Sequence, residues 1–133
     1  MDPVEVVRAE LGEGPIIDIT TTGRRSGQPR RIEIWMLDVD GRFFITGTPG
    51  RRGWLANLAA APDLVVHLKR HAHTDLWARA EVIADLDLRR HVLAHPSAAW
   101  YRGRATLEEL EAGAPMVEVV FSGASAPSTQ SAG

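Results

Sequence analysis

Short runs of β-branched and alternating apolar residues dominate this chain and constrain its fold more than any other feature. They predict six strands, over residues 16–22, 32–39, 42–48, 64–70, 75–83 and 115–121. The early strands follow one another with a single helix inserted, so the regular strand–helix alternation of a parallel sheet is absent. The pattern favours an α+β fold, with a mostly antiparallel sheet closed into a small barrel and a groove beside its flanking helices.

Turn and capping residues divide these runs from one another. Asp40-Gly41 predicts a tight hairpin between the second and third strands. Helices are expected over residues 2–11, 54–61, 85–95 and 106–112, of which the last begins with a capping box of Thr106 and Glu109. The segment SAAWYRGR (97–104) fits no element clearly.

Length and composition predict one domain. A chain of 133 residues can bury about two-thirds of its unfolded surface, and 44% hydrophobic with 24% charged residues is ordinary for a globular protein. We expect residues 1–122 to form the domain. Residues 123–133 (GASAPSTQSAG) are polar and of low complexity, so we expect a disordered tail.

Several function classes are disfavoured by what the sequence lacks. It has no cysteine, hence no disulfide and no thiolate ligand or nucleophile. No apolar run approaches the roughly 18 residues of a spanning helix, and the acidic N-terminus does not resemble a signal peptide, so we expect no integral membrane segment and a cytoplasmic location. Nothing brings the pairs His71/His73 and His91/His95 together, so no metal site is expected.

The sequence TTTGRRSGQPRR (20–31) carries the clearest functional signal. Residues 23–52 hold seven arginines against three acidic residues, whereas the whole chain has a net charge of −2, which points to one anionic partner at one place. Gly23 and Gly27 would let a ligand approach the backbone closely. Arg24, Arg25 and Arg30 would supply charge, and Ser26 a hydroxyl donor. The alternative is a solvated hairpin whose arginines only keep a sheet edge soluble.

A second basic turn, GTPGRRGW (47–54), follows the third expected strand. Two such turns could flank one elongated polyanion. The Gly-x₄-Gly-Lys-Ser/Thr spacing of a phosphate-binding P-loop is missing, and Gly47, Gly50 and Gly53 lie three apart without the GxG of a dinucleotide fingerprint.

The run ITTTGRRSGQPRR resembles the signature of the deazaflavin (F420)-dependent nitroreductases and F420H2-dependent quinone reductases. The similarity continues through IEIWMLDVDGRFFITGT and RGWLANLAAAPDLVVHLK, covering about residues 16–70 closely and 71–121 in outline. It implies a split β-barrel related to FMN-binding flavin reductases and pyridoxamine-phosphate oxidases. It also implies a reductase that passes a hydride from F420H2 to a small electron-poor acceptor such as a quinone or nitro compound.

The resemblance assigns roles to residues by position. Arg24, Arg25 and Arg30 match positions that hold the phosphate and tail carboxylates of F420, with Ser26 and Gly27 beside them. The family usually has a lysine where this chain has Pro49, so Arg51 or Arg52 would substitute for it, with backbone N–H groups near Thr48 and Gly50 facing the phosphate.

Aromatic residues complete the expected site. The resemblance implies that Trp35, Trp54 and Trp100 line the ring pocket, although core packing is an equal interpretation for all three. Tyr101, the single tyrosine, is the candidate proton donor to the reduced acceptor. The protein's role in hydride transfer would otherwise be positional.

Two other functions fit some of these features. The same barrel could bind FMN or another phosphorylated cofactor, with or without turnover. Fewer positive charges would then be needed, because there would be no carboxylate tail like that of F420 to bind. A nucleic-acid-binding face would require aromatic residues between the arginines, and residues 20–31 contain none. We therefore expect no nucleic-acid partner. Barrels of this kind often pair through the sheet, which makes a homodimer a further expectation.

Overall fold

A computed structural model describes residues 2–125 and contains seven strands and a set of short helices. The strands are β1 (Ile16–Thr22), β2 (Pro29–Trp35), β3 (Leu37–Val39), β4 (Arg42–Thr46), β5 (Asp63–Leu68), β6 (Thr74–Val82) and β7 (Met116–Ser125). The helices are α1 (Pro3–Glu13), α2 (Gly53–Ala60), α3 (Leu86–Ala94), the 3₁₀ turn η1 (Pro96–Ala98), α4 (Ala99–Arg102) and α5 (Leu107–Gly113).

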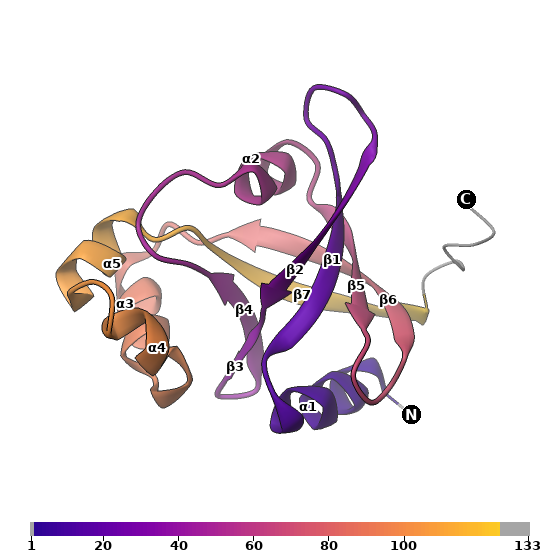
Figure 1. The fold of residues 1–133 in the computed structure, drawn as a ribbon, viewed down its shortest axis with the longest axis horizontal. Helices are drawn as coiled ribbons and strands as arrows, with labels where there is room; N and C mark the ends of the chain where they lie inside the picture. Colours follow the sequence, from indigo (N-terminus) through magenta and orange to yellow (C-terminus); the bar gives the residue numbers. More distant parts are fainter. Residues whose placement is uncertain (1, 126–133) are drawn as a thin grey trace.

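The strands form one antiparallel sheet with the order β2-β1-β5-β6-β7-β4-β3. β2 and β3 are neighbours in the chain but lie at opposite edges of this order, so the sheet curls until its two edges approach (Figure 1). The predicted α+β split β-barrel is confirmed. Its split lies where β2 faces β4 without being its hydrogen-bonded neighbour.

The strand expected over 32–39 is broken at Met36, which raises the strand count from six to seven. The backbone N–H of Met36 donates to the carbonyl of Pro15 at 2.9 Å instead of to a neighbouring strand. The break is required because β2 pairs with β1 at one edge, whereas β3 pairs with β4 at the other. One straight strand cannot reach both partners.

Two apolar clusters pack on opposite sides of the sheet at β4. The cluster inside the curl includes Ile17, Ile19 and Phe43, which alternate with outward-facing residues of their strands. The second cluster includes Phe44 and Leu93 and lies under α3, α4 and α5. Both faces of β4 are therefore covered, which explains its unbroken apolar run. Figure 1 shows α1 and α2 at opposite ends of the curled sheet.

Several local predictions agree with the structure. Asp40 and Gly41 have φ angles of 54° and 83°, as a tight hairpin requires, and both bonds of the Thr106–Glu109 capping box are present. The segment that fitted no element forms η1 and α4.

β7 extends to Ser125, four residues beyond the expected end of the last strand. The first residues of the expected tail, 123–125, therefore belong to this strand, and 126–133 lie outside the described residues. Within residues 2–125, no helix is long and apolar enough to cross a membrane.

Candidate binding groove

The loop that joins β1 to β2 is closed by its own hydrogen bonds. The N–H of Gly23 donates to the carbonyl of Gln28, and the N–H of Gly27 to the carbonyl of Gly23, both at 2.8 Å. The N–H of Gln28 donates to Ser26 Oγ at 3.1 Å. The N–H groups of both glycines therefore serve the turn itself. Gly27 also supplies the positive φ of 70° that the turn needs.

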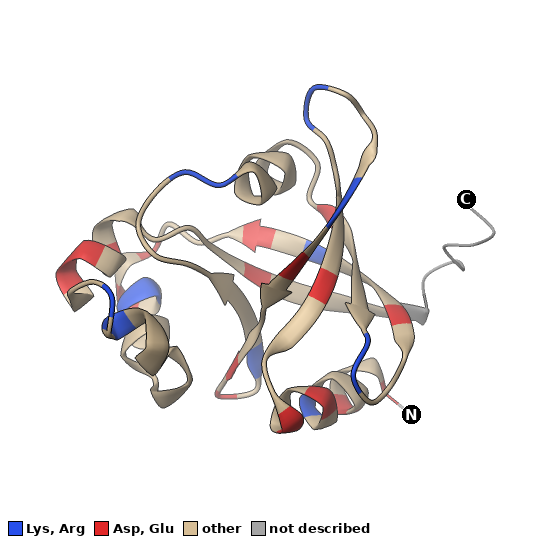
Figure 2. Ribbon diagram, viewed as in Figure 1, with Lys and Arg blue, Asp and Glu red and all other residues tan. Residues whose placement is uncertain are grey.

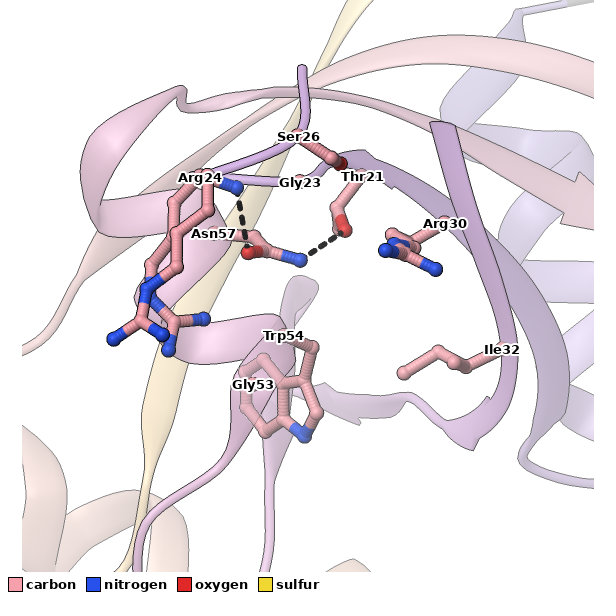
Figure 3. A pocket seen from close by; sticks show the side chains of 10 residues that line it. Thr21, Gly23, Arg24, Ser26, Arg30, Ile32, Gly53, Trp54 and Asn57 are labelled. Carbon is pink, nitrogen blue, oxygen red and sulfur yellow. Dashed lines mark hydrogen bonds between the residues drawn. The ribbon is translucent and has the colours of Figure 1, made fainter. Parts of the chain in front are cut away.

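A side chain of α2 fastens this loop to the barrel. Asn57 Nδ2 donates to Thr21 Oγ1 at 3.1 Å, and Asn57 Oδ1 accepts from the backbone N–H of Arg24 at 3.0 Å (Figure 3). Asn57 and Thr21 are 8% and 3% exposed, so the amide and the hydroxyl satisfy each other away from water.

The loop, β2 and α2 enclose a groove of about 470 Å³. Its lining residues are Thr21, Gly23, Arg24, Arg25, Ser26, Arg30, Ile32, Gly53, Trp54 and Asn57. Alternation along β2 turns Arg30 and Ile32 toward the groove, whereas Arg31 points to the other face and pairs with Asp18 at 2.9 Å. Figure 3 shows the guanidinium groups of Arg24 and Arg30 on opposite sides of the groove.

The arginines of the groove differ in their partners from most arginines of the chain. Arg24, Arg25 and Arg30 make no side-chain hydrogen bond or ion pair with any residue of the described part. By contrast, Arg42 pairs with Glu118 and Arg90 with Glu111. Three unpaired guanidinium groups around one groove produce a positive field there that the chain itself does not neutralise. Figure 2 shows this charge on the β1–β2 loop and more positive charge before α2.

The start of α2 adds to this field. No side chain caps its first turn, and Gly53 and Trp54 of that turn line the groove. The N-terminal end of a helix carries a partial positive charge from its free N–H groups. Ile32 and Trp54 give the groove an apolar section beside the charged one, so the arrangement suits an elongated polyanion that carries a flat apolar ring.

The second basic turn is organised differently from the expectation. Arg52 Nη2 donates to the carbonyl and the hydroxyl of Thr48, each at 3.0 Å, and Nη1 donates to the carbonyl of Arg51 at 3.1 Å. The N–H of Gly50 donates to the carbonyl of Gly113 at 3.3 Å, so it does not face the groove as a free donor. Arg51 lies on the other side of this turn and lines a separate cleft with residues of α3 and α5.

The expected aromatic residues fall into two sets. Trp54 lines the groove, whereas Trp35, Trp100 and Tyr101 pack edge to face with ring centroids 5.3 to 6.3 Å apart. Tyr101 is 6% exposed, and burial raises the pKa of its hydroxyl, which keeps the proton on the oxygen. The guanidinium carbon of Arg104 lies 3.5 Å from the Trp100 ring centroid. Trp35 and Tyr101 do not line the groove itself.

Sequence reasoning missed four groove residues, Thr21, Ile32, Gly53 and Asn57. One signal was available for Asn57, because it is the only polar residue in WLANLAAA (54–61). A single amide in an apolar helix must find a partner when it is buried.

Comparisons with known proteins agree with this geometry. The fold is similar to a putative pyridoxamine 5'-phosphate oxidase from Listeria innocua, with a TM-score of 0.67, 10% identity, and coverage of 90% of this chain and 93% of that chain. It is similar to a conserved hypothetical protein from Mycobacterium tuberculosis, with a TM-score of 0.66, 18% identity, and coverage of 92% and 81%. A third similar structure is an F420-H2 dependent reductase, FDR-A, with a TM-score of 0.55, 22% identity, and coverage of 79% and 93%.

At these identities the structural similarities establish the fold alone. The family evidence is separate, since the family model described as F420H(2)-dependent quinone reductase matches residues 4–107. That range includes β1 to β6, the arginine loop and α2, and therefore the whole groove. The chain belongs to the F420H(2)-dependent quinone reductase family.

Proposed function

We propose that this protein binds F420 in the groove between the β1–β2 loop and α2, and that it reduces a quinone or nitro compound with F420H2. The observation that carries the proposal is the set of three unpaired guanidinium groups, Arg24, Arg25 and Arg30, around a groove with an apolar section. The family match supports the cofactor, because it covers every residue of the groove.

The chemistry of the groove fits the charge distribution of F420, which carries a phosphodiester and a tail of glutamates. Guanidinium groups hold phosphate and carboxylate oxygens with charge-assisted hydrogen bonds. Ser26 Oγ accepts from the Gln28 N–H, so the Ser26 hydroxyl can still donate its hydrogen to the same anionic groups. Trp54 and Ile32 would contact the apolar ring. When bound, F420H2 supplies the hydride from its deazaflavin ring.

The protein's own contribution is to orient the bound molecules and to keep water from the ring. A hydride acceptor also takes up a proton, and Tyr101 stays our candidate donor because its hydroxyl is protonated at neutral pH. Its position outside the groove lining means that the acceptor would have to lie between the groove and the aromatic cluster. Thr48, Arg51, Arg52 and Trp35 also remain predictions as cofactor contacts, and so does Gly50, although its N–H already donates to the carbonyl of Gly113.

A matched pair of charge reversals tests the site. We expect Arg24→Glu to weaken F420 binding more than tenfold, because the change removes one charge-assisted contact and places a carboxylate against an anion. Arg79→Glu changes the net charge equally but lies on an exposed surface pair with Asp63, and we expect little effect. Equal effects in the two variants would mean that only net charge matters, and an unaltered affinity in a folded Arg24→Glu protein would remove the loop from the site.

Turnover is measured by the gain of the visible absorbance of oxidised F420, with a soluble naphthoquinone or a nitroaromatic compound as the acceptor. We expect oxidation of F420H2 that depends on both protein and acceptor, and its absence with every acceptor would contradict the proposed reaction.

The cytoplasmic location and the homodimer stay predictions. Sedimentation of the purified chain tests the dimer, and we propose no role for a partner subunit in the groove.

A further inference from the structure

We propose that Asn57 is a positioning residue that holds the arginine loop in the conformation that binds the cofactor. The inference rests on the proposed function for its ligand, but its first test does not. No role for Asn57 follows from the family match alone. The residue would act through Arg24 and its neighbours without contributing charge of its own.

The first step of the argument is how the loop is attached. Within the described residues, the bond from the Arg24 N–H to Asn57 Oδ1 is the only hydrogen bond that joins residues 23–28 to an element other than β1 or β2. Residues 24–28 are exposed, and the loop projects beyond the sheet (Figure 1). An exposed hairpin end held only by its own turn bonds samples more conformations than one fastened to a helix.

The second step is that the amide is itself fixed. Asn57 Nδ2 donates to Thr21 Oγ1, and both side chains are buried. This bond sets which end of the amide points at the loop, so that Oδ1 is the atom presented to the Arg24 N–H. Thr21 is therefore the orienting partner of Asn57, two residues before the first glycine of the loop.

The third step concerns the opposite wall of the groove. Trp54 precedes Asn57 by three positions on α2, so the two side chains lie on one face of the helix, and both line the groove. One amide thus ties the wall that carries Trp54 to the wall that carries the arginines. Because the two walls are held in place before binding, the protein loses less conformational entropy when a polyanion binds. The affinity for the polyanion is therefore higher.

The first test needs no ligand. Hydrogen exchange of the Arg24 amide is measured by NMR in the wild-type protein, in Asn57→Ala and in the pair Thr21→Ser and Thr21→Val. We expect slow exchange in the wild-type protein and in Thr21→Ser, which keeps the hydroxyl acceptor, and faster exchange in Asn57→Ala and Thr21→Val. Unchanged protection of Arg24 in a folded Asn57→Ala protein would overturn the inference.

The second test uses F420 binding in a double-mutant cycle. We expect Asn57→Ala to raise the Kd about tenfold in the wild-type background, and about threefold or less in Arg24→Ala, because the positioned contact is then absent. Full additivity would overturn the positioning role and leave Asn57 a stabiliser of the fold. If the wild-type protein does not bind F420 at all, the proposed function fails, while the exchange measurement still decides the role of Asn57.

Discussion

The turn that carries the groove arginines leaves no room for a Cβ atom at Gly23. A Cβ built on this residue would lie 2.5 Å from Ser26 Oγ and 3.2 Å from the carbonyl oxygen of Gln28. Both atoms belong to the turn, so a side chain at Gly23 would push apart the segment that carries Arg24 and Arg25. The residue is required for close approach, not for an unusual φ angle.

We expect Gly23→Ala to weaken F420 binding by about tenfold, through displacement of the loop and not through lost charge. Gly12→Ala is the matched control, because a Cβ at Gly12 meets nothing within 4 Å and the residue lies near the end of α1. Replacing a helical glycine by alanine should preserve binding and leave stability equal or slightly higher. Calorimetric titration of both variants with F420 gives the comparison, and equal affinities would contradict the tight packing of the loop.

At the residue scale, the sequence predicts the charge of the site better than its hydrogen bonding. Arg24, Arg25 and Arg30 were expected from their density around two glycines, and all three line the groove. The hydrogen bonds from the Arg52 guanidinium to Thr48 were not predicted, because they depend on where the Thr48 carbonyl and hydroxyl lie after the chain turns. A pattern of basic residues does not show which guanidinium groups stay unpaired.

At the scale of elements, α1 is joined to the turn between β5 and β6 by a buried carboxylate. Glu10 is 2% exposed, and its oxygens accept from the backbone N–H groups of Arg70, His71 and Ala72 at 2.9, 3.1 and 3.0 Å. Burial is the largest single influence and favours the neutral form. The three N–H donors together outweigh it and hold the pKa of Glu10 below the ordinary value of 4.5.

This arrangement makes stability depend on pH in a defined direction. Because the folded-state pKa is lowered, the contribution of Glu10 is complete above the ordinary glutamate pKa and is lost as pH falls through the lowered value. We expect Glu10→Gln to reduce the free energy of unfolding by about 1–3 kcal/mol at pH 7, with a smaller difference in acid. Urea titrations over this pH range, with the exposed Glu13→Gln as control, measure it. A difference that grows toward low pH would contradict the assignment.

The elements that the sequence predicts well are those with local causes. The Asp40-Gly41 hairpin and the Thr106–Glu109 capping box follow from residues within four positions of each other. The break at Met36 was missed because the apolar alternation continues through IEIWMLDV without a glycine or proline. The break arises because β2 pairs with β1, whereas β3 pairs with β4. Strand pairing is long-range, and the periodicity of the sequence does not predict it.

At the scale of the whole molecule, the curled sheet determines where a ligand can lie. The order β2-β1-β5-β6-β7-β4-β3 leaves β2 as an edge strand, and its residues Arg30 and Ile32 line the groove. The barrel class could be predicted from the run of strands, and the family from the GRRSGQPRR signature. The strand order could not, since it is fixed by pairings far apart in the chain, such as β4 with β7.

The central claim is that this groove selects F420, and competing titrations of the purified protein with F420 and with FMN at about 0.15 M salt test it most directly. Both ligands carry a phosphate and a tricyclic ring, but only F420 adds the anionic tail that three unpaired arginines would hold. We expect micromolar or tighter binding of F420 and FMN binding at least about tenfold weaker. Equal or tighter binding of FMN, or binding of neither ligand, would contradict the account.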